Sequence, residues 1–238
     1  MKDWTQTFAE DLWLGPDEVG AEEARFIYKA LRLRKGSRVL DAPCGAGRIT
    51  IHLAHAGCVV TGLDLMPSFT RRAAARFRKE GVTGRFIAQD IRRMEFDGEF
   101  DGVCCWLGGC GYFSEPENRN LIARYARALR NGGRLLVNQI NREWLLRHFI
   151  VSHTKGRLTM RNRWNRRAQR VESDWMVNRD GRTEHNRLSI RLYTPRQMRD
   201  LLEEAGLTFE RAYGSHHGEP FSRATRRMIV VARKSEAR

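Results

Sequence analysis

The sequence has 238 residues, of which 41% are hydrophobic and 30% are charged, and its formal net charge is +15; this balance suits one α/β domain with a full hydrophobic core. No apolar run approaches the roughly 20 residues that a membrane-spanning helix needs, and the first residues lack the basic start and apolar stretch of a signal peptide, so we expect a cytoplasmic protein. The basic excess can steer a polyanion or an acidic small substrate toward the protein, and it is equally compatible with a solvated, arginine-rich surface.

The N-terminal residues 1–24 combine aromatic side chains with seven Asp or Glu and one Lys. We expect residues 1–35 to form a helical arm that closes over a ligand site and excludes water. Trp13 is the residue of this arm that we assign to substrate binding.

From residue 38 onward, short apolar runs alternate with helical patterns, which is typical of a parallel sheet covered by helices. Strands are predicted over residues 37–41, 58–64, 85–88, 100–106, 134–140, 207–213 and 227–234. Helices are predicted over residues 48–56 and 67–79, from the capping-box pair Ser114 and Glu117 to the stop at Asn131-Gly132-Gly133, and from Thr194 to Gly206. The fold class is therefore a doubly wound, mostly parallel seven-stranded α/β sheet.

The stretch between residues 141 and 193 interrupts this alternation. From Arg157 apolar and polar residues alternate with period two, and residues 178–181 have the composition of a tight turn. We predict an inserted three-stranded antiparallel flap with one apolar and one basic face. Residues 155–191 hold eleven Lys or Arg and four Asp or Glu, and we expect these arginines to face solvent or an acidic substituent.

A turn of small residues follows the first predicted strand, with the sequence Asp-Ala-Pro-Cys-Gly-Ala-Gly at residues 41–47. Gly45 and Gly47 let the backbone approach a ligand, at the crevice where open α/β sheets bind cofactors. A dinucleotide-binding fingerprint requires glycine where this chain has Thr50. Asp41 is also poorly suited to face a pyrophosphate, whereas its carboxylate suits an ammonium or, through water, a sulfonium ligand.

Several segments together resemble the class I S-adenosylmethionine-dependent methyltransferases, and most of all their small-molecule branch, which includes glycine and amino-sugar N-methyltransferases. The resemblance rests on the turn at residues 39–48, on Val-Thr-Gly-Leu-Asp-Leu at 60–65, on Gln-Asp-Ile at 89–91, and on residues 100–113, 129–137 and 192–198. These motifs cover most of the chain, and their shared order and spacing carry the resemblance.

The resemblance implies a site for S-adenosylmethionine, which is released as S-adenosylhomocysteine. The implied cofactor-binding residues are Asp41, Ala42, Cys44, Gly45, Gly47, Asp64, Leu65, Asp90, Ile91 and Trp106. Asp41 would line the methionine end, Asp64 would accept both ribose hydroxyls, and Asp90 would accept from the adenine amino group. Aspartates at such places also act as plain helix or turn caps. Many family members have glycine where this chain has Pro43.

Methyl transfer requires mainly that nucleophile, methyl carbon and sulfur are aligned and that water is excluded, so a dedicated base is not essential. Tyr112 after the fourth strand and His148 or His153 before the flap are the nearest side chains for orienting or deprotonating a substrate. We name Tyr112 and His153 as candidate catalytic residues, and Trp13, Tyr112 and Trp175 as candidate substrate-binding residues.

A metal site is not predicted from the sequence. The five cysteines form no paired zinc pattern. His216 and His217 have no carboxylate or thiolate at ligand spacing and are interpreted as an ordinary solvated pair.

The favoured function is methyl transfer from S-adenosylmethionine to an N or O nucleophile of a small metabolite. The basic net charge of the protein is compatible with an acidic metabolite. Three alternatives stay open: an RNA methyltransferase that uses the basic flap, a non-catalytic S-adenosylmethionine-binding regulator and, least favoured, a nicotinamide-dependent oxidoreductase. We expect a single domain, monomeric or homodimeric and without a membrane partner. Its parts are the arm (1–35), a cofactor-binding core (36–140), the flap (141–193) and a C-terminal helix with two strands (194–238).

Overall fold

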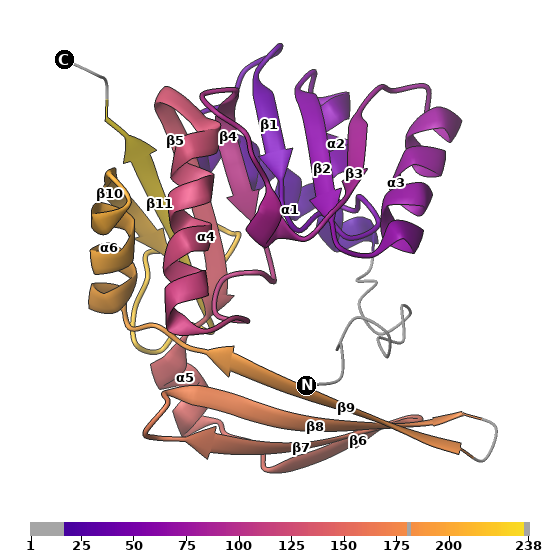
Figure 1. The fold of residues 1–238 in the computed structure, drawn as a ribbon, viewed down its shortest axis with the longest axis vertical. Helices are drawn as coiled ribbons and strands as arrows, with labels where there is room; N and C mark the ends of the chain where they lie inside the picture. The colour runs from indigo at the N-terminus through magenta and orange to yellow at the C-terminus, as the bar shows by residue number, and fades with distance from the viewer. Residues whose placement is uncertain (1–16, 180–181, 236–238) are drawn as a thin grey trace.

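Seven strands form the central sheet of the computed structural model, which describes residues 17–179 and 182–235. The strands are β1 (Arg38–Asp41), β2 (Val59–Asp64), β3 (Arg85–Ala88), β4 (Phe100–Cys105), β5 (Leu129–Ile140), β10 (Leu207–Tyr213) and β11 (Arg227–Lys234). Their order is β10-β11-β5-β4-β1-β2-β3, and β11 alone runs antiparallel to its neighbours (Figure 1). The predicted fold class, a doubly wound and mostly parallel sheet, is confirmed.

Helices cover both faces of this sheet. They are α1 (Asp17–Ala30), α2 (Thr50–His55), α3 (Pro67–Lys79), the short 3-10 helix η3 (Ile91–Arg93), α4 (Glu115–Ala128), α5 (Arg142–Arg147) and α6 (Pro195–Glu204). Val39 and Leu40 are adjacent on β1 and belong to two different buried clusters, because strand side chains alternate between faces. One cluster contains Tyr125 of α4 and the other contains Ile27 of α1, so both helices are integral parts of the core.

The end of α4 differs from the prediction. Asn131-Gly132-Gly133 was expected to stop this helix, but α4 ends at Ala128 and β5 begins at Leu129, which has extended backbone angles. The pairing of β4 with β5 shifts register between Phe100 and Gly102. A Cβ atom on Gly133 would lie 3.0 Å from the carbonyl oxygen of Phe100, so these small residues serve the close approach of the two strands.

The flap is a separate antiparallel sheet of four strands, in the order β6-β7-β8-β9. These are β6 (Ser152–Lys155), β7 (Leu158–Asn165), β8 (Arg170–Arg179) and β9 (Arg182–Arg191). The prediction of three strands missed β6, because all four of its residues are exposed and it has no apolar alternation. Figure 1 shows the flap crossing beneath the edge of the main sheet where β1, β2 and β4 end.

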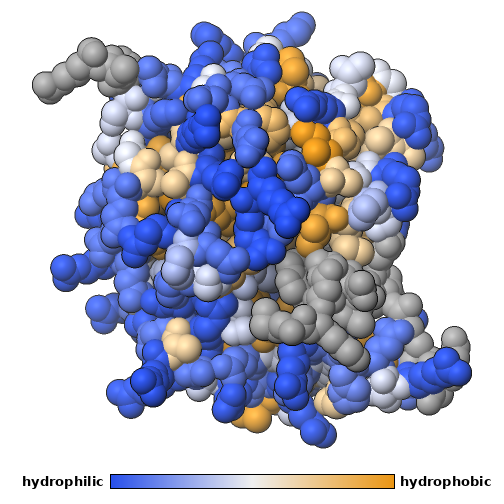
Figure 2. Space-filling view, in the orientation of Figure 1, coloured by the Kyte–Doolittle hydropathy of each residue, from blue (hydrophilic) through white to orange (hydrophobic). Residues whose placement is uncertain are grey.

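The flap has one inner and one outer face, since cross-strand partners point to the same side. Leu158 of β7 and Val177 of β8 are partners and are both buried, whereas Arg161 and Arg163 are exposed. Figure 2 shows that one broad face of the molecule is covered mostly by hydrophilic side chains. Among the described residues no helix is long and apolar enough to cross a membrane.

Candidate active site

A cavity of about 830 Å³ opens at the carboxyl edge of the parallel strands. Eight of the ten predicted cofactor-binding residues line it, together with Tyr112: Asp41, Cys44, Gly45, Asp64, Leu65, Asp90, Ile91 and Trp106. Ala42 and Gly47 belong to the same turn, but both are buried and neither lines the cavity. The parallel sheet brings these positions together, because it ends all its strands at one edge.

Hydrogen bonds to backbone carbonyl oxygens hold the turn after β1. The Cys44 N–H donates to Leu63 O at 3.0 Å, and the Tyr125 hydroxyl donates to Ala42 O at 2.7 Å. The peptide bond before Pro43 is cis. Gly47 has φ +79°, and a Cβ there would lie 2.9 Å from the Cβ of Ala73, so α3 packs against the turn only because this residue is glycine.

Asp64 connects the end of β2 to the turn after β1. Its Oδ2 accepts the Gly45 N–H at 2.9 Å and its Oδ1 accepts the Met66 N–H at 2.9 Å. Burial raises the pKa of Asp64, and the backbone N–H donors of Met66 and Gly45 oppose that shift. The carboxylate oxygens keep acceptor capacity beyond these backbone bonds, which a pair of ligand hydroxyls can use.

Asp41 is 2% exposed and only partly satisfied. Thr50 Oγ donates to its Oδ2 at 2.8 Å, while Oδ1 has no hydrogen-bond partner within the described part of the chain. Burial raises the pKa of Asp41 to about 7, although the Thr50 hydrogen bond opposes the shift. A buried carboxylate with a free oxygen favours a cationic or hydrogen-bond-donating ligand.

A basic side chain lies close to this aspartate. Arg48 begins the segment after the glycine turn, and its Nη2 lies 2.6 Å from Oε2 of Glu23 on α1. Arg48 also lines the cavity and lowers the pKa of Asp41 as a minor contribution. The cavity therefore offers a cation and a carboxylate near the same end.

Asp90 is held by an arginine that the sequence reasoning overlooked. Arg92 Nε and Nη2 donate to its Oδ2 at 3.0 and 2.6 Å, and Arg92 Nη1 reaches Glu117 Oε1 at 2.6 Å. Burial acts to raise the pKa of Asp90, but the Arg92 hydrogen bonds outweigh it and the pKa lies below its usual value. Asp90 is therefore an ionised and oriented acceptor at neutral pH.

Trp106 and Tyr112 close the other side of the cavity. Trp106 is 5% exposed, its ring lies 6.2 Å from that of Phe26, and its Nε1 donor has no hydrogen-bond partner among the residues described. Burial raises the pKa of Tyr112 to about 12. At neutral pH its hydroxyl stays protonated, so it can donate a hydrogen bond but is a poor base.

The remaining candidates lie away from this cavity. His153 is exposed on β6 opposite Met160, and Trp175 of β8 is also paired with Met160; neither lines the cavity in the described structure. His148 stacks on Trp144 with ring centroids 4.4 Å apart. Trp13 and the rest of residues 1–16 of the predicted arm lie outside the described residues. The structure thus brings together the cofactor candidates and Tyr112 only.

The base of the flap is bonded to the cavity wall. Arg170 of β8 donates to the carbonyl oxygens of Phe113 and Gly111, both at 3.0 Å, and the Arg191 N–H donates to Gly111 O at 2.7 Å. Arg191 Nε also donates to Glu115 at 2.7 Å. The expectation that the flap arginines face solvent or substrate is wrong for these two, because they satisfy backbone carbonyls of the loop after β4. Sequence spacing carried no signal for these contacts.

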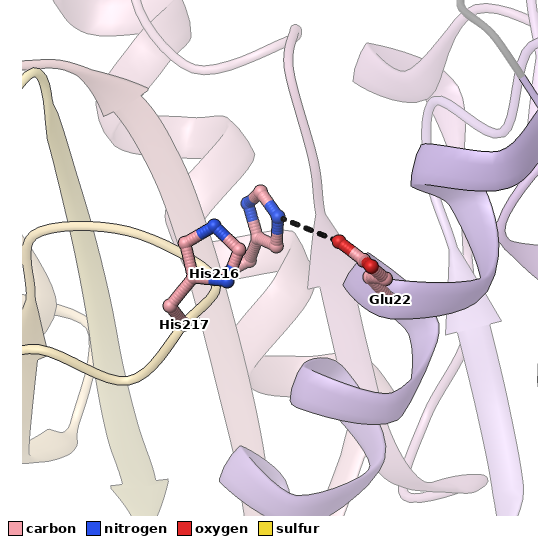
Figure 3. Close-up of side chains that lie close together, drawn as sticks. All are labelled: Glu22, His216 and His217. Carbon is pink, nitrogen blue, oxygen red and sulfur yellow. Dashed lines mark ion pairs between the residues drawn. The ribbon is translucent and has the colours of Figure 1, made fainter.

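A second cluster joins α1 to the loop after β10, and its residues do not line the cavity. Glu22 of α1 places its Oε2 3.7 Å from Nε2 of His216, and one donor atom from each of Glu22, His216 and His217 lies within 4.8 Å of the others (Figure 3). The carboxylate absent from the local sequence is therefore supplied by another element. These atoms are suitable metal ligands, but Arg25 and Lys29 line the same hollow and oppose a cation there.

Residues 39–133 match the family model of a methyltransferase domain. Over these residues the chain is similar to a methyltransferase domain. This segment includes the turn after β1, Asp64, Asp90 and Trp106, so the family match and the cavity coincide.

Relatives and solved structures agree with this assignment. A glycine/sarcosine N-methyltransferase of Halorhodospira halochloris is 30% identical over 143 residues, which are 58% of this chain and 53% of the relative. The chain spans about half the length of the curated relatives that it matches. An S-adenosylmethionine-dependent methyltransferase of Clostridium acetobutylicum has a similar fold, with a TM-score of 0.75, 16% identity and coverage of 90% and 91% of the two chains.

A sugar N-methyltransferase of Streptoalloteichus sp. is also similar in fold, with a TM-score of 0.72 and 22% identity over 97% of this chain and 94% of that one. The likeness extends through the flap as well as the methyltransferase domain, since it covers nearly the whole chain. The resemblance drawn from the sequence motifs is confirmed at the level of family and fold.

Proposed function

We propose that this protein transfers the methyl group of S-adenosylmethionine to an N or O nucleophile of a small metabolite. The single observation that carries the proposal is the pairing of two buried carboxylates, Asp41 and Asp64, at the ends of adjacent strands in one cavity. The cofactor carries an ammonium at its methionine end and a ribose diol farther along, and these groups require such acceptors in that order.

The residues present fit the cofactor. Asp41 keeps an unpartnered buried oxygen within the described structure, which suits the ammonium directly or through a water molecule. Asp64 keeps acceptor capacity for both ribose hydroxyls, and Arg48 offers a cation for the carboxylate of the methionine end. Asp90, oriented by Arg92, would accept from the adenine amino group next to Ile91.

The bound cofactor would supply an electrophilic methyl group on its sulfonium. The chain itself has to orient the acceptor and exclude water. Trp106 would do this with its buried indole N–H, and Tyr112 with a hydroxyl that remains a donor at neutral pH. Neither takes a proton, so an amine acceptor would enter in its neutral form or lose its proton to water.

Two observations favour a small acceptor over RNA. The similar glycine/sarcosine and sugar N-methyltransferases act, by their names, on small nitrogen compounds. On the outer face of the flap, Arg163 contacts Glu172 and Arg187 Nε lies 2.9 Å from Asp174 Oδ1, so part of the basic charge is already neutralised. A phosphate backbone would have to displace these carboxylates.

The test is a turnover assay that detects S-adenosylhomocysteine after incubation with S-adenosylmethionine and a panel of acceptors. We expect product with a small amine or alcohol and none with transcribed RNA. Turnover with RNA alone would favour the nucleic-acid alternative. Tight binding of the cofactor with no turnover across the panel would favour a regulator.

A further inference from the structure

Arg227 is a cavity residue that the proposed cofactor site does not use. It is the first residue of β11, which runs antiparallel to β5, so it lies beside Ile140 at the edge where the parallel strands end. It lines the 830 Å³ cavity together with Tyr112 and Trp106. The reversed direction of one strand therefore delivers a guanidinium to the carboxyl edge of the sheet.

The guanidinium of Arg227 has no acceptor within the described residues, either as a hydrogen bond or as an ion pair. The nearby charged and titratable groups are Arg226, Glu23 and Tyr112. Glu23 is already engaged by Arg48 at 2.6 Å, and Tyr112 stays a neutral phenol because burial raises its pKa to about 12. Burial and the neighbouring Arg226 lower the pKa of Arg227, yet an arginine remains charged in proteins.

A half-buried cation that pairs with no carboxylate of the described residues favours a ligand that brings a counter-ion. Arg227 faces a cavity whose other walls include Trp106 and Phe113. A ligand with a carboxylate or phosphate would satisfy it, since the planar guanidinium matches these groups in a two-pronged geometry.

The place of Arg227 in the sheet indicates that this anionic ligand is the methyl acceptor and not the cofactor. The proposed cofactor residues come from β1, β2 and η3, whereas β11 is separated from β1 by β5 and β4. Arg48, next to Asp41, is the cation on the cofactor half of the cavity. Arg227 comes from the β11 side of the sheet and is a neighbour of Tyr112, so we place the acceptor there.

We propose that Arg227 binds the anionic group, a carboxylate or a phosphate, of the methyl acceptor and thereby selects acidic small metabolites. This inference rests on the proposed methyltransferase function. It assigns the anion recognition to one residue of the central sheet and not to the arginines of the flap.

The experiment measures anion binding to protein saturated with S-adenosylhomocysteine, by calorimetric titration with acetate and with inorganic phosphate at constant ionic strength. The variants are Arg227→Gln, Arg227→Lys and the control Arg226→Gln. Arg226 is exposed and lies over the Trp144 ring at 5.6 Å, so its loss removes the same charge from the basic chain without touching the cavity.

We expect Arg227→Gln to weaken anion binding by about tenfold or more, Arg227→Lys to weaken it less, and Arg226→Gln to have much the smallest effect, since Arg226 does not line the cavity. S-adenosylhomocysteine should bind all four proteins equally. Binding of only one of the two probes would tell whether the acceptor carries a carboxylate or a phosphate.

Three results would overturn the inference while leaving the proposed function intact. These are no anion binding by the loaded wild-type protein, equal binding by Arg227→Gln, or a loss of S-adenosylhomocysteine affinity in that variant, which would assign Arg227 to the cofactor. Failure of the wild-type protein to bind S-adenosylhomocysteine would instead overturn the proposed function itself.

Discussion

At the scale of a single side chain, the proposed role of Asp41 makes cofactor binding depend on pH. Its pKa is raised from 3.8 to about 7 by burial, so its charged form is disfavoured in the folded protein. Without ligand, this group lowers stability as pH rises from its unfolded pKa to about 7. A bound ammonium favours the charged carboxylate of Asp41 instead. A ligand that binds below about pH 7 must therefore displace the proton of Asp41.

We therefore expect the affinity for S-adenosylhomocysteine to fall as pH is lowered through about 7, by up to about tenfold per pH unit. Calorimetry in buffers of different ionisation enthalpy measures the released proton directly. Asp41→Asn should bind more weakly and lose this pH dependence. A wild-type affinity that stays constant across this range would exclude the role given to Asp41.

Tyr112 leads to a different expectation, because its hydroxyl is a donor and not a base. Tyr112→Phe keeps the ring and should lower kcat by roughly tenfold to a hundredfold. The pH profile between about pH 6 and about pH 9 should keep its shape, since the Tyr112 pKa lies near 12. Steady-state kinetics with the identified acceptor provide the test. A limb of the profile that disappears in Tyr112→Phe would show that Tyr112 titrates in this range.

Among the larger elements, the flap and the loop after β4 act as one unit. Gly111 has φ +94°, and a Cβ there would collide with the Arg191 carbonyl. Its own carbonyl oxygen accepts from both Arg170 and the Arg191 N–H. The loop that carries Tyr112 is therefore positioned by the base of the flap.

Gly111→Ala should accordingly destabilise the protein by about 1–3 kcal/mol, through backbone strain and the displaced flap base. Gly108→Ala is the matched control, because a Cβ there would meet only Pro43 Cγ at 3.5 Å, an ordinary contact. Chemical denaturation of the two variants measures the difference. Equal stabilities would mean that the contact between loop and flap does not constrain the fold.

Most of the central sheet could be predicted from the sequence, because its strands are short apolar runs with turn residues at their ends. The limits of α3, β3, β10 and β11 agree with the prediction residue by residue. β6 could not be predicted, since Ser152–Lys155 is exposed and is ordered by pairing with β7. The end of α4 was misplaced because Gly132 and Gly133 are residues that usually stop a helix. In this chain they lie within β5, where its pairing with β4 shifts register.

The residues of the candidate site that lie at the ends of parallel strands could be predicted. Contacts between residues far apart in the sequence could not. Asp41 and Asp64 follow directly from their places at the ends of β1 and β2. Arg227 was not found because it begins the antiparallel strand, so no rule on parallel strand ends applies to it. The Glu22–His216 contact joins α1 to a loop far along the chain, and neither segment indicates the other.

At the scale of the whole molecule, a ligand at the carboxyl edge bridges several strands of the central sheet. At a concentration about a hundred times its Kd, such a ligand stabilises the fold by about 2.7 kcal/mol, which corresponds to a rise in Tm of about 5–10 °C for a chain of this size. We expect S-adenosylhomocysteine to produce this shift and NAD to produce none, as thermal denaturation would measure. A shift with NAD alone would revive the nicotinamide alternative.

The net charge of +15 does not by itself define a nucleic-acid surface, because carboxylates are interleaved with the arginines. In the flap, Arg163 contacts Glu172 and Arg187 contacts Asp174. The distribution of charge, which composition cannot reveal, therefore favours a small ligand in the cavity over a polyanion on the flap.

The most direct test of the central claim is a calorimetric titration with S-adenosylhomocysteine of the wild-type protein, Asp64→Ala and the control Asp97→Ala. Asp97 is exposed and pairs with Arg127 at 3.2 Å, so its loss should leave the cavity unchanged. We expect micromolar binding by the wild type and the control, and a loss of about tenfold or more in folded Asp64→Ala. No binding by the wild type, or equal binding by Asp64→Ala, would contradict the proposed cofactor site.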